Sequence, residues 1–212
     1  IQKYFNDCKF RLGFNTYYTL LDNYIIRDDF TINGSSTIIF DDEVGKVLAN
    51  QNRKTAYVFG YTASYQGKIS DKINTSGFVT YTKGRTHDTD EPLSSIPPLF
   101  GQFDLNYEDH KLQLGASFRF NSKKDIADFN IIEGIDNHDL TPIVDPNATE
   151  EVTVYYGSPS WITLGFNSTY TFNYHWSLQG IIGNIFDQHY REFASGISAP
   201  GRNFSFSLTT TF

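Results

Sequence analysis

Apolar and polar residues alternate in segments spread over the whole of this 212-residue chain, and this period of two constrains its fold most. In the segment 9–21, Phe10, Leu12 and Phe14 alternate with Arg11 and Asn15. Side chains repeat every second residue along a β-strand, and no segment shows a convincing helical period of 3.6. The pattern recurs at 55–65, 73–81, 99–107, 111–120, 161–172, 175–186 and 201–212. The sequence therefore predicts an all-β, antiparallel protein with about eight strands.

The connections between these segments alternate in length. Short connections occupy 66–72, 108–110 and 172–175, and the long ones lie near 27–52, 83–98, 121–159 and 187–201. In an up-and-down sheet, alternate connections lie at the same end, so every long loop shares one end. Short turns at one end and long loops at the other are typical of an outer-membrane β-barrel, with the long loops outside the cell.

The length of the strands and the places of the aromatic residues favour a membrane barrel over a soluble β-sandwich or a lipocalin-like barrel, which alternate in the same way. The segments are near the 9–11 residues of a tilted spanning strand. Aromatic side chains suit the lipid–water boundary, and here they gather near both strand ends. The expected girdles are Tyr65, Tyr107, Phe172, Trp176 and Phe212 at the short turns, and Tyr57, Tyr81, Phe120 and Phe204 at the long loops.

Composition excludes several classes of protein. The net charge of −7 argues against a nucleic-acid partner, which requires a basic surface. No run approaches the 18 or so apolar residues of a membrane-spanning helix. The single cysteine, Cys8, excludes an internal disulfide framework. The chain contains no methionine and begins at Ile1, so we expect a processed product or a fragment of a longer protein.

The stretch GNIFDQHYREFASGISAPGRNFSFSLTTTF carries a family resemblance. It is similar to the C-terminal end of TonB-dependent outer-membrane receptors. The matching positions are Asn184, Ile185, Phe186, Asp187, Tyr190, Pro200, Gly201, Arg202 and Phe212. The stretches SSIPPLFGQFDLNYED and NQNRKTAYVFGYTASY resemble two upstream segments of the same family. Gly60 is followed by Tyr61 and Thr62 where the family often has Glu, and Thr210 replaces a frequent aromatic residue, which leaves the subfamily open.

The resemblance implies a fold and a function for the chain. Such receptors form 22-stranded barrels with a plugged lumen. Residues 1–212 would then be the C-terminal part of the barrel, without the plug domain and the N-terminal strands. The implied function is TonB-energised uptake of a scarce nutrient, which could be an iron chelate, haem, cobalamin or a glycan, bound by the long extracellular loops. The alternative is a self-contained eight-stranded outer-membrane barrel with a structural, adhesive or rim-hydrolase role.

The resemblance also implies the partners and the location. We expect outer-membrane lipid around the barrel, the plug and the remaining strands against this segment, the TonB complex acting through the absent N-terminus, and the outer-membrane assembly machinery. The implied location is the outer membrane of a Gram-negative cell, and the expected ligand is a small-molecule nutrient.

Candidate ligand contacts lie in the long loops. We expect no catalytic centre, metal site or cofactor, because the five histidines share no ligand spacing and no nucleophile–base pair is evident. The candidates for substrate contact are His87, Asp88, His138, Tyr155, Tyr156 and Trp161, each with plain loop surface as the alternative. The loop 121–159 is rich in acidic residues, so it is either a site for Ca²⁺ or a cationic ligand, or a solvated surface.

The C-terminal strand carries two further predictions. Arg202 is expected to order the preceding loop by hydrogen bonding, and Phe212, by family resemblance, to serve as the signal read by the assembly machinery. The expected lipid-facing residues of this strand are Phe204, Phe206, Leu208 and Phe212, and the expected lumen-facing residues are Asn203, Ser205, Ser207, Thr209 and Thr211.

Overall fold

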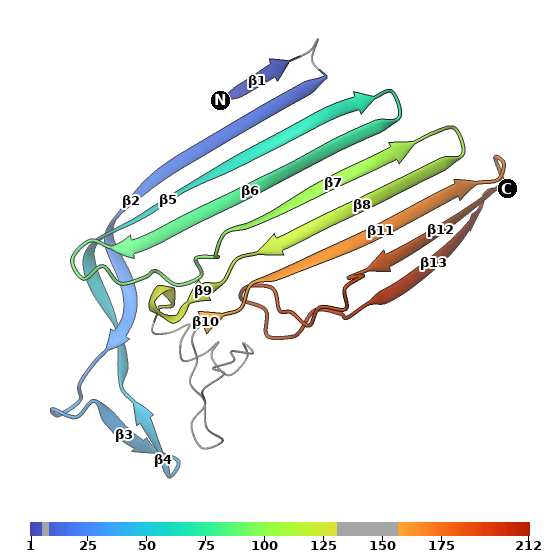
Figure 1. Ribbon diagram of the computed structural model, residues 1–212. Helices are drawn as coiled ribbons and strands as arrows, with labels where there is room; N and C mark the ends of the chain where they lie inside the picture. Colours follow the sequence, from blue (N-terminus) through green and yellow to red (C-terminus); the bar gives the residue numbers. More distant parts are fainter. Residues whose placement is uncertain (6–8, 131–156) are drawn as a thin grey trace.

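One curved antiparallel sheet of nine strands makes up most of the protein (Figure 1). The computed structural model describes residues 1–5, 9–130 and 157–212. The strand order is β1-β2-β5-β6-β7-β8-β11-β12-β13, so the chain runs up and down through neighbours. The sheet strands are β1 (Gln2–Phe5), β2 (Phe10–Asp29), β5 (Leu48–Ser70), β6 (Ile73–Thr86), β7 (Phe100–Glu108), β8 (Leu112–Asn121), β11 (Trp161–Thr171), β12 (Trp176–Gly183) and β13 (Asn203–Thr210). All eight predicted strands are present, and β1 is an additional short one.

The remaining elements are small and lie outside this sheet. They are the hairpin strands β3 (Thr37–Phe40) and β4 (Glu43–Lys46), the paired strands β9 (Lys124–Asp125) and β10 (Gly157–Ser158), and the 3-10 helix η1 (Ile126–Asp128). Among the described residues, no helix is long or apolar enough to cross a membrane.

The apolar residues of neighbouring strands form one continuous surface, which we call the outer face. Directly opposed residues of antiparallel strands lie on the same face. Phe103 of β7 opposes Phe118 of β8, and Phe118 opposes Leu164 of β11. The ring centroids of Phe103 and Phe118 are 6.3 Å apart. The same register continues through β12 to Phe206 on β13, so the predicted alternation holds across the sheet.

The opposite, inner face is polar and carries many small residues. Asp104 opposes Ser117, which in turn opposes Gly165. The hydroxyls of Thr62 and Thr80 are 3.0 Å apart and share a hydrogen bond across β5 and β6. A sheet with one apolar and one polar face suits lipid outside and a wet lumen inside.

Tyr17 is an exception on the inner face, and it explains a nearby glycine. It opposes Gly60, and its hydroxyl shares a 3.1 Å hydrogen bond with the hydroxyl of Thr82. A Cβ atom at Gly60 would lie 2.7 Å from the Tyr17 hydroxyl and 2.6 Å from the Tyr81 carbonyl oxygen. Glycine at this position therefore allows the tyrosine ring to lie flat across β5.

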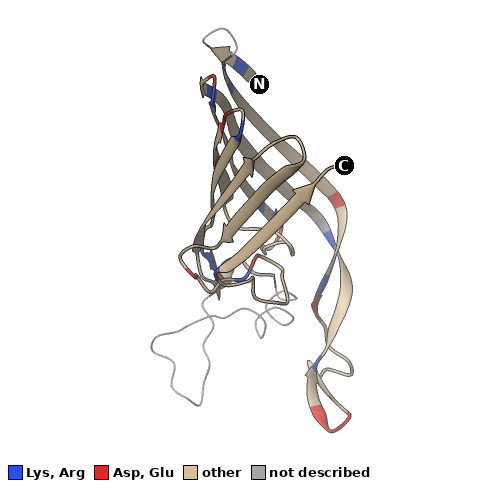
Figure 2. Ribbon diagram, turned by 90° about the vertical axis from the view of Figure 1, so that its right-hand side faces the viewer, with Lys and Arg blue, Asp and Glu red and all other residues tan. Residues whose placement is uncertain are grey.

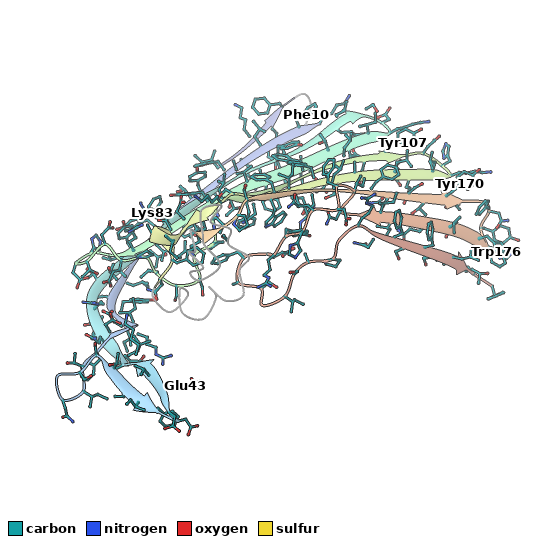
Figure 3. The ribbon with its side chains drawn as sticks, turned by 60° about the horizontal axis from the view of Figure 1, so that its bottom comes forward. Phe10, Glu43, Lys83, Tyr107, Tyr170 and Trp176 are labelled. Carbon is teal, nitrogen blue, oxygen red and sulfur yellow. The ribbon has the colours of Figure 1, made fainter. Side chains whose placement is uncertain are left out.

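Three short turns lie at one end of the sheet, which we call the turn end, and the long connections lie at the loop end. β5–β6, β7–β8 and β11–β12 join at the turn end. Figure 3 shows Phe10, Tyr107, Tyr170 and Trp176, from β2, β7, β11 and β12, spread along this end, while Lys83 lies toward the loop end of β6. Charged residues concentrate toward the strand ends and leave the middle of the sheet largely neutral (Figure 2).

Lys72 and Asp109 join two neighbouring turns. The Lys72 ammonium lies 3.0 Å from the Asp109 carboxylate. The hydrogen bond from Lys72 lowers the pKa of the Asp109 carboxyl, and a backbone hydrogen bond at His110 lowers it further. A carboxyl with a depressed pKa stabilises the fold above its unfolded-state pKa, and this contribution disappears as the pH falls through the folded-state pKa.

Replacing Lys72 with methionine should raise the pKa of Asp109 toward its ordinary value, because the main hydrogen bond that lowers it is removed. The measurement is a ¹³C NMR pH titration of aspartate carboxyl carbons in the folded protein. Lys68→Met is the control, since Lys68 contacts Asp71 instead. An unchanged Asp109 titration in Lys72→Met would contradict the assignment.

A long two-stranded projection extends from the loop end, where the sequence predicted a polar loop. That prediction, for residues near 27–52, is wrong for much of its length: β2 runs to Asp29 and β5 begins at Leu48, with the β3–β4 hairpin between them (Figure 1). Lys46 pairs with Asp29 at 2.7 Å. Asp41 and Asp42 have φ values of 54° and 63°, which fits the two-residue hairpin turn that requires positive φ at both central positions.

Candidate functional site

A recessed cavity lies against the inner face at the loop end, with a volume of about 270 Å³. Phe78 of β6 and Phe100 of β7 contribute two walls, with ring centroids 6.1 Å apart in an edge-to-face arrangement. Both are large apolar residues on a face that is mostly polar. The other principal lining groups are Arg119 of β8, Trp161 of β11 and Phe193 of the loop that follows β12.

Trp161 lies at the centre of this arrangement. It begins β11 opposite Asn121 and is only 8% exposed. Its ring centroid lies 4.3 Å from that of Tyr190, and the Arg119 guanidinium lies 5.7 Å from the Trp161 ring centroid. Arg119 also pairs with Glu192 at 2.8 Å. These contacts hold the loop after β12 over the inner face. Tyr190 is part of this loop, and its burial raises the pKa of its phenol.

A buried lysine adds positive charge near the cavity. Lys124 of β9 is 4% exposed, and its ammonium lies 4.4 Å from the ring centroids of both Phe129 and Phe193. It donates a 2.8 Å hydrogen bond to the carbonyl oxygen of Ile96. Aromatic faces and cationic groups together suit planar organic ligands and ligands with negative charge.

Two polar residues order the loop from 187 to 201. Asn184 is 6% exposed; its side-chain nitrogen donates to the carbonyl oxygens of Gln188 and Pro200, and its side-chain oxygen accepts from the backbone N–H of Gln188. Asp187 accepts a 2.7 Å hydrogen bond from the backbone N–H of Arg202. The predicted hydrogen-bonding residue, Arg202, thus takes part through its backbone, while its guanidinium lies 3.8 Å from the Asp187 carboxylate.

Replacing Asn184 with alanine should loosen this loop, because three buried hydrogen bonds are lost at a cost of roughly 1–3 kcal/mol. Hydrogen exchange at the Gln188 amide of the folded protein should accelerate. Asn203→Ala is the matched control, since Asn203 is exposed and its side chain donates to the Gly201 carbonyl oxygen. Equal protection in both variants would contradict the role assigned to Asn184.

The structure places the predicted contact residues that it describes in different surroundings and does not bring them together in one site. Trp161 lines the cavity. The His87 ring lies 5.0 Å from that of Tyr57, whose opposition to Leu20 puts it on the outer face. Asp88 is exposed and accepts a hydrogen bond from the Thr89 backbone. The candidates His138, Tyr155 and Tyr156 lie outside the described residues.

The sequence did not reveal the other cavity residues. Phe78, Phe100 and Arg119 lie in strands, where an inward aromatic or basic side chain resembles any other member of the alternating pattern. Phe78 and Phe100 both occupy polar-phase positions, and this break in phase was the available signal.

The described part of the acidic loop forms two ion pairs, one with β6 and one within the loop. Asp128 pairs with Arg85 at 2.7 Å, and Asp125 pairs with Lys123 at 2.5 Å. Within residues 1–5, 9–130 and 157–212, no group of three or more His, Cys, Asp or Glu side chains is placed to hold a metal ion.

Comparison with solved structures identifies the fold. The copper transporter OprC superposes with a TM-score of 0.67 at 18% sequence identity, covering 100% of this chain and 30% of OprC. The siderophore receptor PirA from Acinetobacter baumannii gives a TM-score of 0.66 at 20% identity, with 100% and 30% coverage. The pyoverdine outer membrane receptor FpvA from Pseudomonas aeruginosa PAO1, bound to pyoverdine, gives 0.67 at 16% identity, with 100% and 28% coverage. The chain thus spans less than a third of the length of each.

Sequence comparison gives the family directly. A search of curated protein sequences found no match. The family described as TonB dependent receptor-like, beta-barrel matches residues 3–185, which is most of the chain. The match confirms the predicted family and outer-membrane β-barrel fold, and the chain belongs to the TonB-dependent receptor β-barrel family.

Proposed function

We propose that this chain forms the C-terminal strands of an outer-membrane receptor that takes up a scarce nutrient with energy from TonB. The observation that carries the proposal is the pairing of a continuous apolar outer face with a polar inner face that holds a recessed aromatic cavity at the loop end. A ligand captured by extracellular loops would meet this cavity on its way into the lumen. Family membership supports the same function.

The remaining partners follow from this proposal. Outer-membrane lipid contacts the outer face, and a plug domain and further strands of the complete receptor lie beside this segment. The TonB complex acts through a region outside this chain. The outer-membrane assembly machinery recognises the C-terminal strand.

The names of similar proteins and the chemistry of the cavity narrow the ligand. OprC is named as a copper transporter, and PirA and FpvA as receptors for a siderophore and for pyoverdine. Phe78, Phe100 and Trp161 present ring surfaces, and Arg119 presents a guanidinium beside them. We therefore propose a metal chelate with a planar or aromatic part as the ligand.

Trp161→Ala in the complete receptor should lower uptake of the transported chelate about thirtyfold, the scale of an aromatic hot spot worth about 2 kcal/mol. The assay is uptake of a panel of radiolabelled iron(III) and copper(II) chelates by cells that depend on this receptor. Trp176→Ala is the matched control, because Trp176 lies on the outer face at the turn end. Heat-modifiable migration on gels shows that both variants assemble. Equal uptake by assembled Trp161→Ala and wild type would refute a role for the cavity.

The alternative, a self-closed eight-stranded barrel, is not the arrangement observed. β1 and β13 are the two edges of the nine-stranded sheet, and within the described residues they do not pair with each other. Unpaired backbone groups cannot face lipid, so in the membrane both edges require partner strands. We propose that the other strands of the complete receptor supply them.

A further inference from the structure

Arg191 and Ser158 carry buried hydrogen-bond donors that no described group satisfies. Nε and Nη1 of Arg191 and Oγ of Ser158 are buried and have no hydrogen-bond partner. Both residues line one small cavity beside the larger one described above. Arg191 lies in the loop after β12, and Ser158 lies in β10, so two separate segments bring these donors together.

Leaving these donors unsatisfied is energetically unfavourable. A buried donor without a partner costs roughly 1–3 kcal/mol, and more when it is charged. The neighbouring carboxylate does not neutralise Arg191, because Glu192 forms its ion pair with Arg119 at 2.8 Å. The Arg191 guanidinium thus brings a positive charge to the cavity, and among the described residues no acceptor meets its buried Nε and Nη1.

We infer that this cavity is a binding site for an oxyanion, specifically the carboxylate group of the transported ligand. Charged guanidinium N–H groups donate strong hydrogen bonds to carboxylate oxygens, and a hydroxyl can donate a further one. Phe129 and Phe193 line the same cavity, and the Lys124 ammonium lies 4.4 Å from both ring centroids.

The size of the cavity limits what it can hold. Its volume is about 20 Å³, enough for a small polar group but not for a whole chelate. It adjoins the 270 Å³ cavity, and the two share Asn121, Glu192 and Phe193 as lining residues. The pair of cavities therefore fits a ligand whose planar body lies against Trp161 and whose carboxylate arm reaches Arg191. The placement of the ligand's planar body against Trp161 rests on the proposed function, whereas the anion site is inferred from its own unsatisfied donors.

Citrate is the probe for the anion site, used with the complete receptor in detergent and labelled with [¹⁵Nε]arginine. The Arg191 Nε–H signal is assigned by its loss in Arg191→Lys. Citrate should shift this signal saturably. Arg191→Gln should weaken citrate affinity, followed by isothermal calorimetry, by about tenfold or more, as expected for a lost charge-assisted hydrogen bond. Ser158→Ala should weaken it less, and Arg27→Gln, at an exposed site on the projection, should leave it unchanged.

An Arg191 signal that does not move with citrate would overturn the inference, as would equal citrate affinity in Arg191→Gln and wild type. A phosphate titration tests whether the site prefers a carboxylate or another oxyanion. A weaker response of the Arg191 signal to phosphate than to citrate supports a carboxylate, and a stronger response to phosphate overturns that assignment. The Trp161→Ala uptake result is independent of this titration. Citrate binding with unaffected uptake would retain the anion site and reject the proposed role of the larger cavity.

Discussion

Ala116→Arg should lower the free energy of unfolding of the complete barrel in lipid vesicles by about 2–4 kcal/mol, the cost of a cationic side chain near the bilayer midplane. Ala116 is near the middle of β8 on the outer face, opposite Leu105 of β7 and Phe166 of β11. An arginine there must enter the hydrocarbon or bend toward the interface.

The neighbouring residue provides a matched control. Ser117 is a small residue on the inner face, opposite Asp104, so Ser117→Arg places the same charge beside a carboxylate. Its unfolding free energy should stay close to the wild-type value. Denaturant titration in vesicles, followed by heat-modifiable migration, measures both variants. A larger loss in Ser117→Arg than in Ala116→Arg would mean that the two faces are assigned the wrong way round.

Deleting Phe212 should sharply reduce the amount of complete receptor assembled in the outer membrane. Phe212 continues the alternation of Phe204, Phe206 and Leu208, and it is fully exposed. The end of the strand is held by a 2.9 Å hydrogen bond from the Thr211 backbone N–H to the His175 carbonyl oxygen, so the terminal ring is presented at a defined place. We propose that the assembly machinery reads this ring.

Phe212→Tyr is the control for this deletion, because it keeps an aromatic ring at the end of the strand. The measurement is the heat-modifiable fraction in isolated outer membranes, normalised to total receptor. Wild-type levels of the folded form after the deletion would remove Phe212 as an assembly signal.

The faces of the sheet were predictable because they depend only on local alternation. Because side chains alternate along each strand, Phe103, Phe118 and Leu164 were expected on the apolar face. The strand pairing in the structure places the three side by side on that face. The additional strand β1 was missed because its four residues form too short a segment to show a period.

The projection and the cavity were less predictable for physical reasons. β2 and β5 extend beyond the lipid-sized span, where both faces meet water and the apolar alternation is no longer required. The cavity depends on register between distant segments: Arg119 meets Glu192 only after β8 and the loop beyond β12 are placed. Trp161 was a candidate because it is an aromatic residue beside a long loop; the structure places it in the cavity wall, and its contact with a ligand stays a prediction. Asn184 and Asp187 belong to a family motif that is visible in the sequence. Their roles were not predictable, because the sequence alone does not place the backbone groups that they bind.

The central claim is that the face bearing Phe118 contacts lipid and the face bearing Ser117 contacts the lumen. The most direct test is a nitroxide scan of residues 112–121 in the complete receptor, in vesicles, with Cys8 and any other native cysteine replaced. We predict that collision with oxygen, which dissolves in lipid, peaks at every second position, in phase with Leu114, Ala116 and Phe118, and falls at Ser117 and Arg119. A scan without this alternation, or with maxima at Ser117 and Arg119, would contradict the account.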